Sequence, residues 1–314
     1  MLDSQPAPRM RAFVKRSADQ DDIALQDVPI PAIGEDELLI DVRAVGVGIH
    51  DSYFLSTDIS YPYPIGIEAA GEVAEVGGRV TSYRPGDRLA FISVMQPKGG
   101  TWAEFAAVAM DALILTIPEG MSFEQAAAVP VAGSTALKAL HMLPIQSRDS
   151  LFIAGASGAV GTLAIQLAKA RGWRVAASAS QANQEYLRSL GADLTVDYRE
   201  ADWPAQVRGW APGGVDAAVA IQPGTSADTM QTIREGGFLV TVSGDRIEPE
   251  RGIGVAVVTQ QIDVRPELTE LMDGIADGGY RLALERTYPF AEGLDALRKV
   301  QSRHARGKVV LLVA

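Results

Sequence analysis

Residues 151–172 read LFIAGASGAVGTLAIQLAKARG, and this stretch decides the fold. It begins with a short apolar run, Leu151 to Ala154, whose lack of polar alternation is typical of a strand buried on both faces of a parallel sheet. Apolar residues at helical spacing follow from Val160 to Ala168, and Gly172 suits the end of a helix. A second strand is predicted from Arg174 to Ala177, so the segment has the order and length of one βαβ unit.

A glycine-rich turn joins the first strand to the helix. Without side chains, its backbone can approach a pyrophosphate closely, and the anionic oxygens then meet the free N–H groups of the helix start. The strict G-x-G-x-x-G pattern would have glycine where the chain has Ala156, but this departure costs little if Gly155 makes the tight turn. A turn that serves tight packing alone is the alternative, and the strand before and the helix after it favour dinucleotide binding. The residues expected to contact the dinucleotide here are Gly155, Ala156, Ser157, Gly158, Ala159, Val160 and Gly161.

Composition limits the classes of function. The 314 residues are enough for two domains, and 47% hydrophobic with 21% charged residues is ordinary for a globular enzyme. A net charge of −11 repels nucleic-acid backbones and acidic membrane surfaces, so we expect neither as a partner. The lack of cysteine excludes disulfides, thiolate zinc sites and a cysteine nucleophile. No apolar run is long enough to span a bilayer and the N-terminal MLDSQPAPRMR lacks a signal-peptide core, so a cytoplasmic location is expected.

Two patterns of secondary structure divide the chain. Up to about residue 117, short strands alternate with turns such as Arg84-Pro85-Gly86-Asp87, which predicts a small β-barrel or sandwich. After Pro118-Glu119-Gly120, strands and helices alternate up to about residue 242, which predicts a doubly wound parallel sheet. Two further helices and a last strand are expected to return to the first domain. The predicted domains are residues 1–120 with 264–314, and residues 121–263.

Six short stretches, each weak alone, are specific in their order and spacing. They are Ala44-Val45-Gly46-Val47 running to Asp51 and Tyr53, Gly66 to Gly71, Pro85 to Arg88, Gly155 to Gly161, Gly191-Ala192-Asp193 running to Asp197-Tyr198-Arg199, and Ala305 to Leu311. Together they resemble the zinc-independent quinone oxidoreductases of the medium-chain dehydrogenase/reductase superfamily, over nearly the whole chain. The resemblance implies an α/β fold, with a GroES-like β-barrel catalytic domain, a Rossmann domain with a doubly wound parallel sheet, and a cleft between them.

The chain departs from the zinc-dependent relatives at two metal-ligand positions. Where those relatives place a cysteine and a histidine, this chain has Gly48 and Ile67, so no catalytic metal is expected. His50 beside Asp51 could still serve a metal, although a role in lining the cleft or packing is the stronger interpretation. Glu68 is interpreted as a structural carboxylate, as it usually is in the family, and a general base is the alternative.

The end of the second strand bears on the choice of cofactor. An enzyme that uses NAD needs a carboxylate there to bind the ribose hydroxyls, and that carboxylate would repel a 2′-phosphate. This chain has Ala176-Ala177-Ser178-Ala179-Ser180, without an acid, which favours NADPH. Ser178 and Ser180 could donate hydrogen bonds to the 2′-phosphate, and by resemblance Tyr198 and Arg303 would complete its pocket. A solvated helix residue is the alternative for Arg303, and Asn183 stands where relatives often have a cation.

The expected reaction is a hydride transfer to a conjugated acceptor. The cofactor carries the chemistry, while the protein supplies position and electrostatics in a dry cleft. Without zinc to polarise a substrate, a quinone or an enone is favoured over a simple alcohol, because conjugation spreads the developing negative charge. A tyrosine or water could supply the proton, although aromatic residues in such a loop also serve as ordinary walls. The residues expected near the reacting groups are Tyr53, Asp51 and Thr135, with Tyr61 and Tyr63 as further candidates, and Val242, Ser243 and Gly244 at the nicotinamide.

Three functions follow from this sequence. The first is NADPH-dependent reduction of a quinone or other conjugated carbonyl. The second is reduction of the double bond of an enone or enoyl thioester, and the third is a non-catalytic NADPH-binding protein. The resemblance also implies a homodimer, and the apolar segment 254–258 is the predicted strand that pairs across a twofold axis. An internal edge strand covered by a loop is the alternative for that segment.

Overall fold

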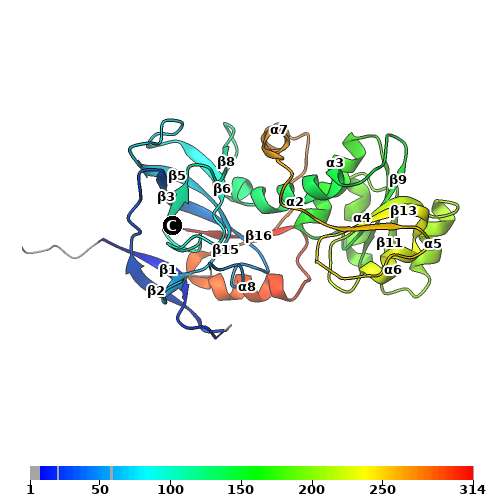
Figure 1. Cartoon of the computed structure of the whole chain (residues 1–314), viewed down its shortest axis with the longest axis horizontal. Coiled ribbons are helices and arrows are strands. Elements are labelled where there is room, and N and C mark those ends of the chain that lie inside the picture. Colours follow the sequence, from blue (N-terminus) through cyan, green and yellow to red (C-terminus); the bar gives the residue numbers. More distant parts are fainter. Residues whose placement is uncertain (1–7, 20, 57–58, 314) are drawn as a thin grey trace, which may run out of the picture. The chain divides into compact units, whose positions relative to one another are not determined.

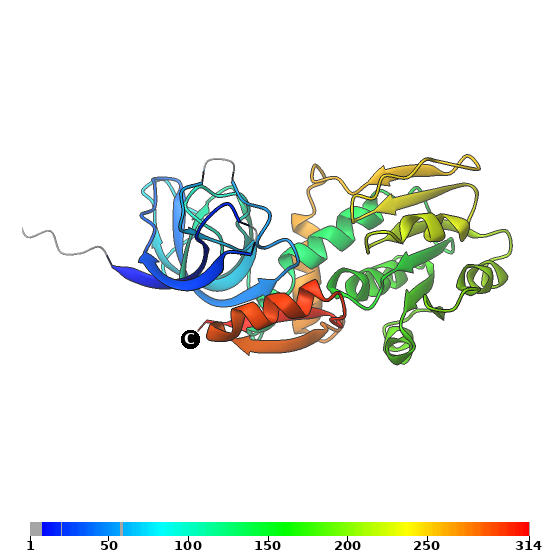
Figure 2. The same cartoon turned by 90° about the horizontal axis from the view of Figure 1, so that it is seen from below.

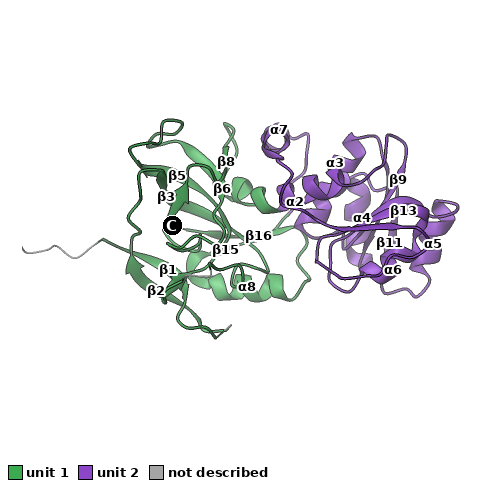
Figure 3. Cartoon of the chain, viewed as in Figure 1, with its two compact units in different colours: residues 1–131, 284–314 green, residues 132–283 purple. Residues whose placement is uncertain are grey.

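The structure is a computed structural model that describes residues 8–19, 21–56 and 59–313. The chain forms two compact units (Figure 3): unit 1 comprises residues 1–131 and 284–314, and unit 2 comprises residues 132–283. Figure 1 labels the helices and strands along the chain.

Unit 1 is built mainly from antiparallel strands. They are β1 (Arg9–Lys15), β2 (Ile23–Pro29), β3 (Glu37–Val47), β4 (Tyr63–Pro64), β5 (Glu68–Val76), β6 (Arg88–Ile92), β7 (Phe105–Ala109), β8 (Leu113–Thr116), β15 (Leu284–Pro289) and β16 (Lys308–Leu312). Within the described residues they make a seven-stranded sheet, in the order β15-β16-β3-β5-β6-β8 with β7 on β3, and a three-stranded sheet in the order β2-β1-β4. The β15–β16 pair is parallel, whereas β16 runs antiparallel to β3.

Three short helical segments accompany these sheets. They are α1 (Phe123–Ala127), the 3₁₀ segment η1 (Phe290–Glu292) and α8 (Gly293–Gln301). Figure 2 shows α8, in red-orange, alongside β15, and α8 contacts both β15 and β16. Phe13 of β1 joins the small sheet to the main core, because its ring meets Trp102 at 5.6 Å and Phe290 at 5.4 Å between centroids, edge to face in both pairs.

Unit 2 is a parallel sheet connected by helices. Its strands are β9 (Ser150–Ala154), β10 (Arg174–Ala179), β11 (Leu194–Asp197), β12 (Val215–Ala220), β13 (Ile233–Thr241) and β14 (Gly254–Val257). Its helices are α2 (Pro130–His141), whose first two residues belong to unit 1, α3 (Ala159–Ala170), α4 (Gln181–Ser189), α5 (Trp203–Trp210), α6 (Ser226–Gln231) and α7 (Arg265–Ala276). The strands described in this unit lie in the order β11-β10-β9-β12-β13-β14, and every neighbouring pair is parallel. The strand order reverses between β9 and β12, where open α/β sheets form a binding crevice beyond the carboxyl ends of the strands.

The predicted α/β class and the βαβ unit are confirmed, and β14 stands where an apolar strand was predicted. The compact units, however, divide the chain elsewhere than the predicted boundaries do. Residues 121–131 belong to unit 1, because α1 packs on β3, β5 and β6. Residues 264–283 belong to unit 2, where Glu267 of α7 bonds to His141 of α2 at 3.0 Å. Residues 290–301 form η1 followed directly by α8.

Two residues near the boundary define the starts of α1 and α2. Ser122 caps α1 in a capping box, since its hydroxyl accepts the Gln125 N–H and the Gln125 side chain accepts the Ser122 N–H. Pro130 is the first residue of α2, a position where its missing N–H costs nothing. In the described part of the chain, no helix is long and apolar enough to cross a membrane.

Candidate active site

The turn between β9 and α3 has the geometry of a phosphate cradle. Gly155 adopts a φ of +74°, and a Cβ there would stand 2.6 Å from Cγ of Gln222, so this position requires glycine. Ala156 is fully buried and donates its N–H to the Ser178 carbonyl at 3.0 Å. Gly155 therefore makes the tight turn, and Ala156 fits where the strict fingerprint has glycine.

The other two glycines of the turn have different neighbours. A Cβ on Gly161 would lie 2.5 Å from Cα of Ala156, so this glycine lets α3 pack directly against the turn. A Cβ on Gly158 would meet only the Gly155 carbonyl, at 3.9 Å. Gly158 is the N-cap of α3 and has no side chain to cap the helix, so the N–H groups of the first turn remain for an anion. This arrangement fits the pyrophosphate of a dinucleotide.

The end of β10 presents hydroxyl groups and no carboxylate. Ser178 is buried, and its Oγ accepts the Gly155 N–H at 3.3 Å, which ties β10 to the cradle. Ser180 is the N-cap of α4, and its Oγ accepts a hydrogen bond from Asn183 Nδ2 at 3.3 Å. Tyr198 is 47% exposed, with the Arg199 guanidinium 5.5 Å from its ring centroid. Ser178, Ser180 and Tyr198 are the residues of unit 2 that were predicted to bind a ribose 2′-phosphate.

An acid does stand at the end of the neighbouring strand, β11. The carboxylate of Asp197 accepts the N–H of Gln181 at 2.9 Å and that of Arg199 at 3.0 Å. The sequence alone does not predict these hydrogen bonds of Asp197, because the pairing of β10 with β11 brings its partners close. The carboxylate is therefore used to fix the start of α4 and the loop that carries Tyr198.

The end of β13 and the residues that follow it carry buried hydroxyl groups. Thr241 Oγ1 and Ser243 Oγ are buried and make no hydrogen bond of normal geometry, although the Ser243 side chain interacts with the Asp245 carboxylate and helps to lower its pKa. Gly244 has a φ of +76° and nothing within 4 Å of where its Cβ would be. Buried hydroxyls normally have partners, so this segment is suited to a polar ligand at the carboxyl end of the sheet. The predicted residues Val242, Ser243 and Gly244 all lie here.

The predicted catalytic loop of unit 1 is anchored by Asp51. This residue is 1% exposed, and its Oδ2 accepts the Gly48 N–H at 2.9 Å and the Trp102 Nε1–H at 2.8 Å. Burial raises the pKa of Asp51 to about 7, against the opposing effects of the Lys308 charge and these hydrogen bonds. A carboxyl enclosed in this way holds the loop in place, and it is not presented to a substrate. Tyr53, by contrast, is 46% exposed.

Glu68 is part of a buried ion pair. It is 1% exposed, its carboxylate pairs with the Lys308 ammonium, and its Oε2 accepts the Val131 N–H at 2.7 Å. Burial raises the pKa of Glu68, while Lys308 and the Val131 N–H oppose that rise. The carboxylate thus ties β5 to β16 and to the start of α2, which agrees with the structural interpretation of this residue.

The two remaining predicted residues lie elsewhere in the fold. Thr135 is half-buried in the second turn of α2, in unit 2. Arg303 follows α8 in unit 1, with a φ of +59°. Burial lowers the pKa of His50, and the Arg303 charge lowers it further. The structure therefore groups the cradle, Ser178, Ser180 and residues 242–244 within unit 2, and it groups Asp51, Tyr53 and Arg303 within unit 1.

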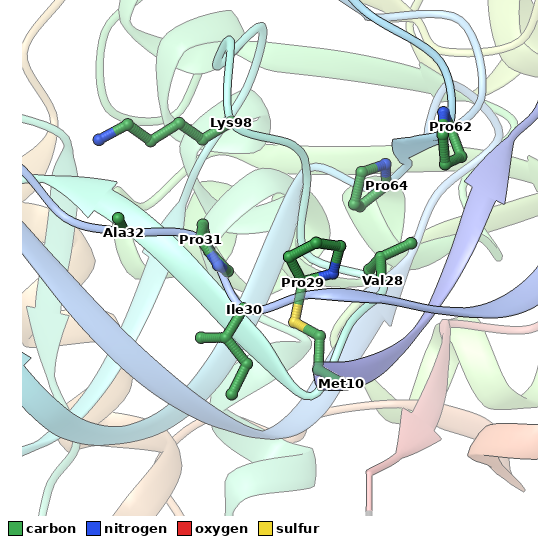
Figure 4. A pocket seen from close by; sticks show the side chains of 9 residues that line it. All are labelled: Met10, Val28, Pro29, Ile30, Pro31, Ala32, Pro62, Pro64 and Lys98. Atoms are coloured by element: carbon green, nitrogen blue, oxygen red, sulfur yellow. The ribbon is translucent and has the colours of Figure 1, made fainter. Parts of the chain in front are cut away.

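Two hollows lie apart from all these residues. One, of about 400 Å³, is in unit 1 and is lined largely by apolar and proline side chains around Met10 and Pro64, with Lys98 at its rim (Figure 4). The other, of about 470 Å³, is in unit 2 between α3 and the segment 278–281. Among the described residues, no cluster of three or more His, Cys, Asp or Glu side chains could hold a metal ion.

Comparison with known proteins gives two family matches. Residues 34–119 match the alcohol dehydrogenase GroES-like domain family, and residues 190–311 match the family described as zinc-binding dehydrogenase. The former match includes Gly48 and Ile67, the two positions that lack metal ligands.

Named proteins are similar to this chain over nearly its whole length. The NADPH-dependent alkenal/one oxidoreductase of Arabidopsis thaliana chloroplasts is 33% identical over 304 residues, covering 91% of this chain and 74% of that protein. The quinone oxidoreductase of Sus scrofa is 29% identical over 307 residues, covering 91% and 92%. The structure of the quinone oxidoreductase from Coxiella burnetii superposes with a TM-score of 0.87 at 27% identity, covering 98% of this chain and 100% of that one. This chain therefore belongs to the quinone oxidoreductase-like family of the medium-chain dehydrogenase/reductase superfamily, and it is an oxidoreductase that uses a pyridine nucleotide.

Proposed function

We propose that this protein uses NADPH to reduce a quinone or another conjugated carbonyl compound without a catalytic zinc ion. The proposal rests on the residues at the end of β10. Ser178 lies in this strand and Ser180 follows it, and the run 176–180 contains no acidic residue. A phosphate on the ribose would meet hydroxyl donors there, and the nearby Asp197 carboxylate is already bonded to the N–H groups of Gln181 and Arg199. Gly48 and Ile67 at the two ligand positions support chemistry without zinc.

The chain's own residues divide the binding work. In the proposal, the N–H groups at the start of α3 bind the pyrophosphate, and Gly158 leaves room for its approach. Ser178, Ser180 and Tyr198 of unit 2 offer hydroxyl groups to the 2′-phosphate, and Arg303 is the cation proposed to bind it. Thr135 and the segment Val242-Ser243-Gly244 position the nicotinamide end, beside the buried Ser243 hydroxyl. When bound, NADPH supplies a hydride.

The acceptor side belongs to the loop that Asp51 anchors. Tyr53 is exposed on this loop and offers a hydroxyl to the carbonyl oxygen of the acceptor. One hydride and one proton add to the conjugated system, and the proton comes from Tyr53 or from water. Because neither Gly48 nor Ile67 provides a ligand for a Lewis acid, the acceptor itself must spread the developing charge, with help from oriented hydroxyl donors.

NADPH oxidation with a panel of acceptors tests this function. We expect turnover with quinones and enones, and poor reaction with saturated aldehydes and simple alcohols. Tyr53→Phe should lower turnover of enones by about tenfold while leaving NADPH affinity unchanged, and it should matter less for quinones, which can take protons from water. Efficient oxidation of simple alcohols, with no reaction of quinones or enones, would overturn the proposal.

Reduction of an alkenal or enone double bond is the second candidate. The relative from Arabidopsis thaliana, named an alkenal/one oxidoreductase, favours it. In the same panel, higher kcat/KM for enones or enoyl thioesters than for quinones would select this candidate. Tight NADPH binding with no turnover of any acceptor would instead indicate a non-catalytic binding protein.

We also propose that the protein is a homodimer that pairs along β14. This strand ends the described sheet of unit 2, and its residues are at least partly exposed, with Val257 at 52%. An apolar edge strand that stayed open to solvent would be prone to pair with other chains, and a twofold partner satisfies it.

A further inference from the structure

Asp245 connects two loops at the carboxyl edge of the unit 2 sheet. It follows Ser243-Gly244 in the loop after β13. Its Oδ2 accepts the Gly224 N–H at 2.9 Å and the Ser226 hydroxyl at 2.8 Å; Gly224 lies in the loop after β12, and Ser226 is the first residue of α6. One carboxylate oxygen therefore holds together the chain segments that leave two neighbouring strands.

The loop held by Asp245 also touches the cradle. Gln222 lies in that loop, and its Cγ is the atom that a Cβ on Gly155 would meet at 2.6 Å. Thr225 donates both its N–H and its hydroxyl to the Gln222 carbonyl, at 3.4 and 2.6 Å. These bonds connect Gln222 to the segment that contains Gly224 and Ser226, the two partners of Asp245. A series of contacts therefore connects the cradle, through Gln222, to Asp245 and Ser243. The cradle and Gln222 follow β9 and β12, the two strands between which the strand order reverses.

The charge of Asp245 makes this connection strong. Burial would raise the pKa of Asp245, but hydrogen bonds from the Ser226 and Ser243 side chains and from backbone N–H groups outweigh burial and lower the pKa below its usual value. Asp245 is therefore an anion at neutral pH, and both contacts are charge-assisted. Gly224 and Gly244 have φ values of +76° with no atoms within 4 Å of a Cβ, so neither loop is held by side-chain packing at these glycines.

We propose that Asp245 is a positioning residue for the nicotinamide end of the cofactor. By binding Gly224 and Ser226, it fixes Ser243 and Gly244 beside the cradle, and it does so without contacting the cofactor itself. This inference rests on the cofactor site of the proposed function, but it does not depend on the acceptor. Since the nicotinamide end is common to both nucleotides, Asp245 should contribute equally to the binding of NADPH and NADH.

Nucleotide affinity of purified variants, measured by fluorescence titration, tests the proposal. Asp245→Ala should raise the Kd for both nucleotides by about tenfold, because two charge-assisted hydrogen bonds are lost. Asp245→Asn should raise it only about two- to threefold, since one amide oxygen can accept from both donors. Ser226→Ala, which removes one donor and keeps the acid, should fall between the two variants. The double variant Asp245→Ala with Ser226→Ala should bind no more weakly than Asp245→Ala alone.

Asp149→Ala is the matched control. Asp149 accepts the Gln146 N–H at 2.8 Å in the turn that leads into the amino end of β9, so its loss costs a turn hydrogen bond far from the cradle. The control should bind both nucleotides as wild type does. Hydrogen exchange of the nucleotide-free protein gives a second measurement, in which the Gly224 amide should exchange faster in Asp245→Ala than in the control.

Two results would overturn the proposal. One is Asp245→Ala protein that exchanges faster at Gly224 yet binds both nucleotides like wild type. The other is an equal loss of affinity in Asp149→Ala, which would point to general destabilisation. A failure of the acceptor panel leaves both measurements intact, because neither requires turnover.

Discussion

A single residue, Asp51, makes the stability of the folded protein depend on pH. Its pKa rises from 3.8 to about 7 on folding because the carboxyl is enclosed, and its Oδ2 nonetheless accepts two N–H groups. The folded protein therefore binds a proton that the unfolded chain releases between these two values. The stability that Asp51 contributes is complete below the unfolded pKa and is lost as the pH rises through the folded pKa.

Asp51→Asn should remove this pH dependence. The amide does not titrate, and its oxygen can replace Oδ2 as the acceptor for Gly48 and Trp102. Between pH 4 and pH 8, wild type should lose about 2–4 kcal/mol of unfolding free energy relative to Asp51→Asn. Urea unfolding at several pH values measures the difference, and parallel stability curves for the two proteins would contradict it.

Arg303 is the charged residue expected to distinguish the two nucleotides. If it contacts the 2′-phosphate, Arg303→Ala should weaken NADPH binding by about tenfold, the value of one charge-assisted contact, and leave NADH binding unchanged. Arg298→Ala is a suitable control, because Arg298 is also an exposed residue, on α8, paired with Asp295. Equal affinities of the wild type for NADPH and NADH would show that the pocket is absent.

At the scale of elements, two glycines near the start of α3 have different roles: Gly161 is needed for packing, and Gly158 leaves space for the cofactor. Gly161→Ala would place a methyl group 2.5 Å from Cα of Ala156 and should cost about 1–3 kcal/mol of stability through overpacking. Gly158→Ala meets only one atom, at 3.9 Å, so it should cost under about 1 kcal/mol, while its methyl group obstructs the pyrophosphate. Thermal unfolding and NADPH titration of the two variants check this. Weak binding together with low stability in Gly158→Ala would refute this difference in roles.

The same elements show what a sequence can predict. The cradle was predictable because an apolar strand, a glycine turn and an amphipathic helix are adjacent in the chain. The anchoring of Asp51 was not, because its partner Trp102 lies 51 residues away and only the folded unit 1 brings them together. Asp245 likewise has the sequence of an ordinary turn residue after Ser243-Gly244. Its partners come from the preceding loop, and the pairing of β12 with β13 decides that they meet.

The placement of α7 was also beyond the sequence. Its pattern predicts an amphipathic helix, and Leu268, Leu271, Met272 and Ile275 are indeed buried. Such a pattern indicates that one face packs, but it does not identify the domain that receives it. The Glu267 contact with His141 of α2 places α7 in unit 2.

At the scale of the whole molecule, the backbone N–H groups on the outer edge of β14 need hydrogen-bond acceptors. The N–H of Val258 donates to the Thr241 carbonyl at 2.9 Å, so by the two-residue alternation of a strand the N–H of Ala256 also faces β13. The N–H groups of Val255 and Val257 then face away from the sheet. A second copy that pairs antiparallel with this edge would accept hydrogen bonds from them.

This geometry predicts different effects of proline at adjacent positions. Val257→Pro removes an outward N–H, so it should leave unit 2 folded and convert the dimer to a monomer. Ala256→Pro removes an N–H that faces β13, so it should destabilise unit 2, and Val257→Thr should change neither property. Light scattering at micromolar concentration measures the mass, and circular dichroism on heating measures the stability. A wild type that is monomeric would refute the homodimer, whereas a Val257→Pro protein that remains dimeric would show that the subunits associate through another surface.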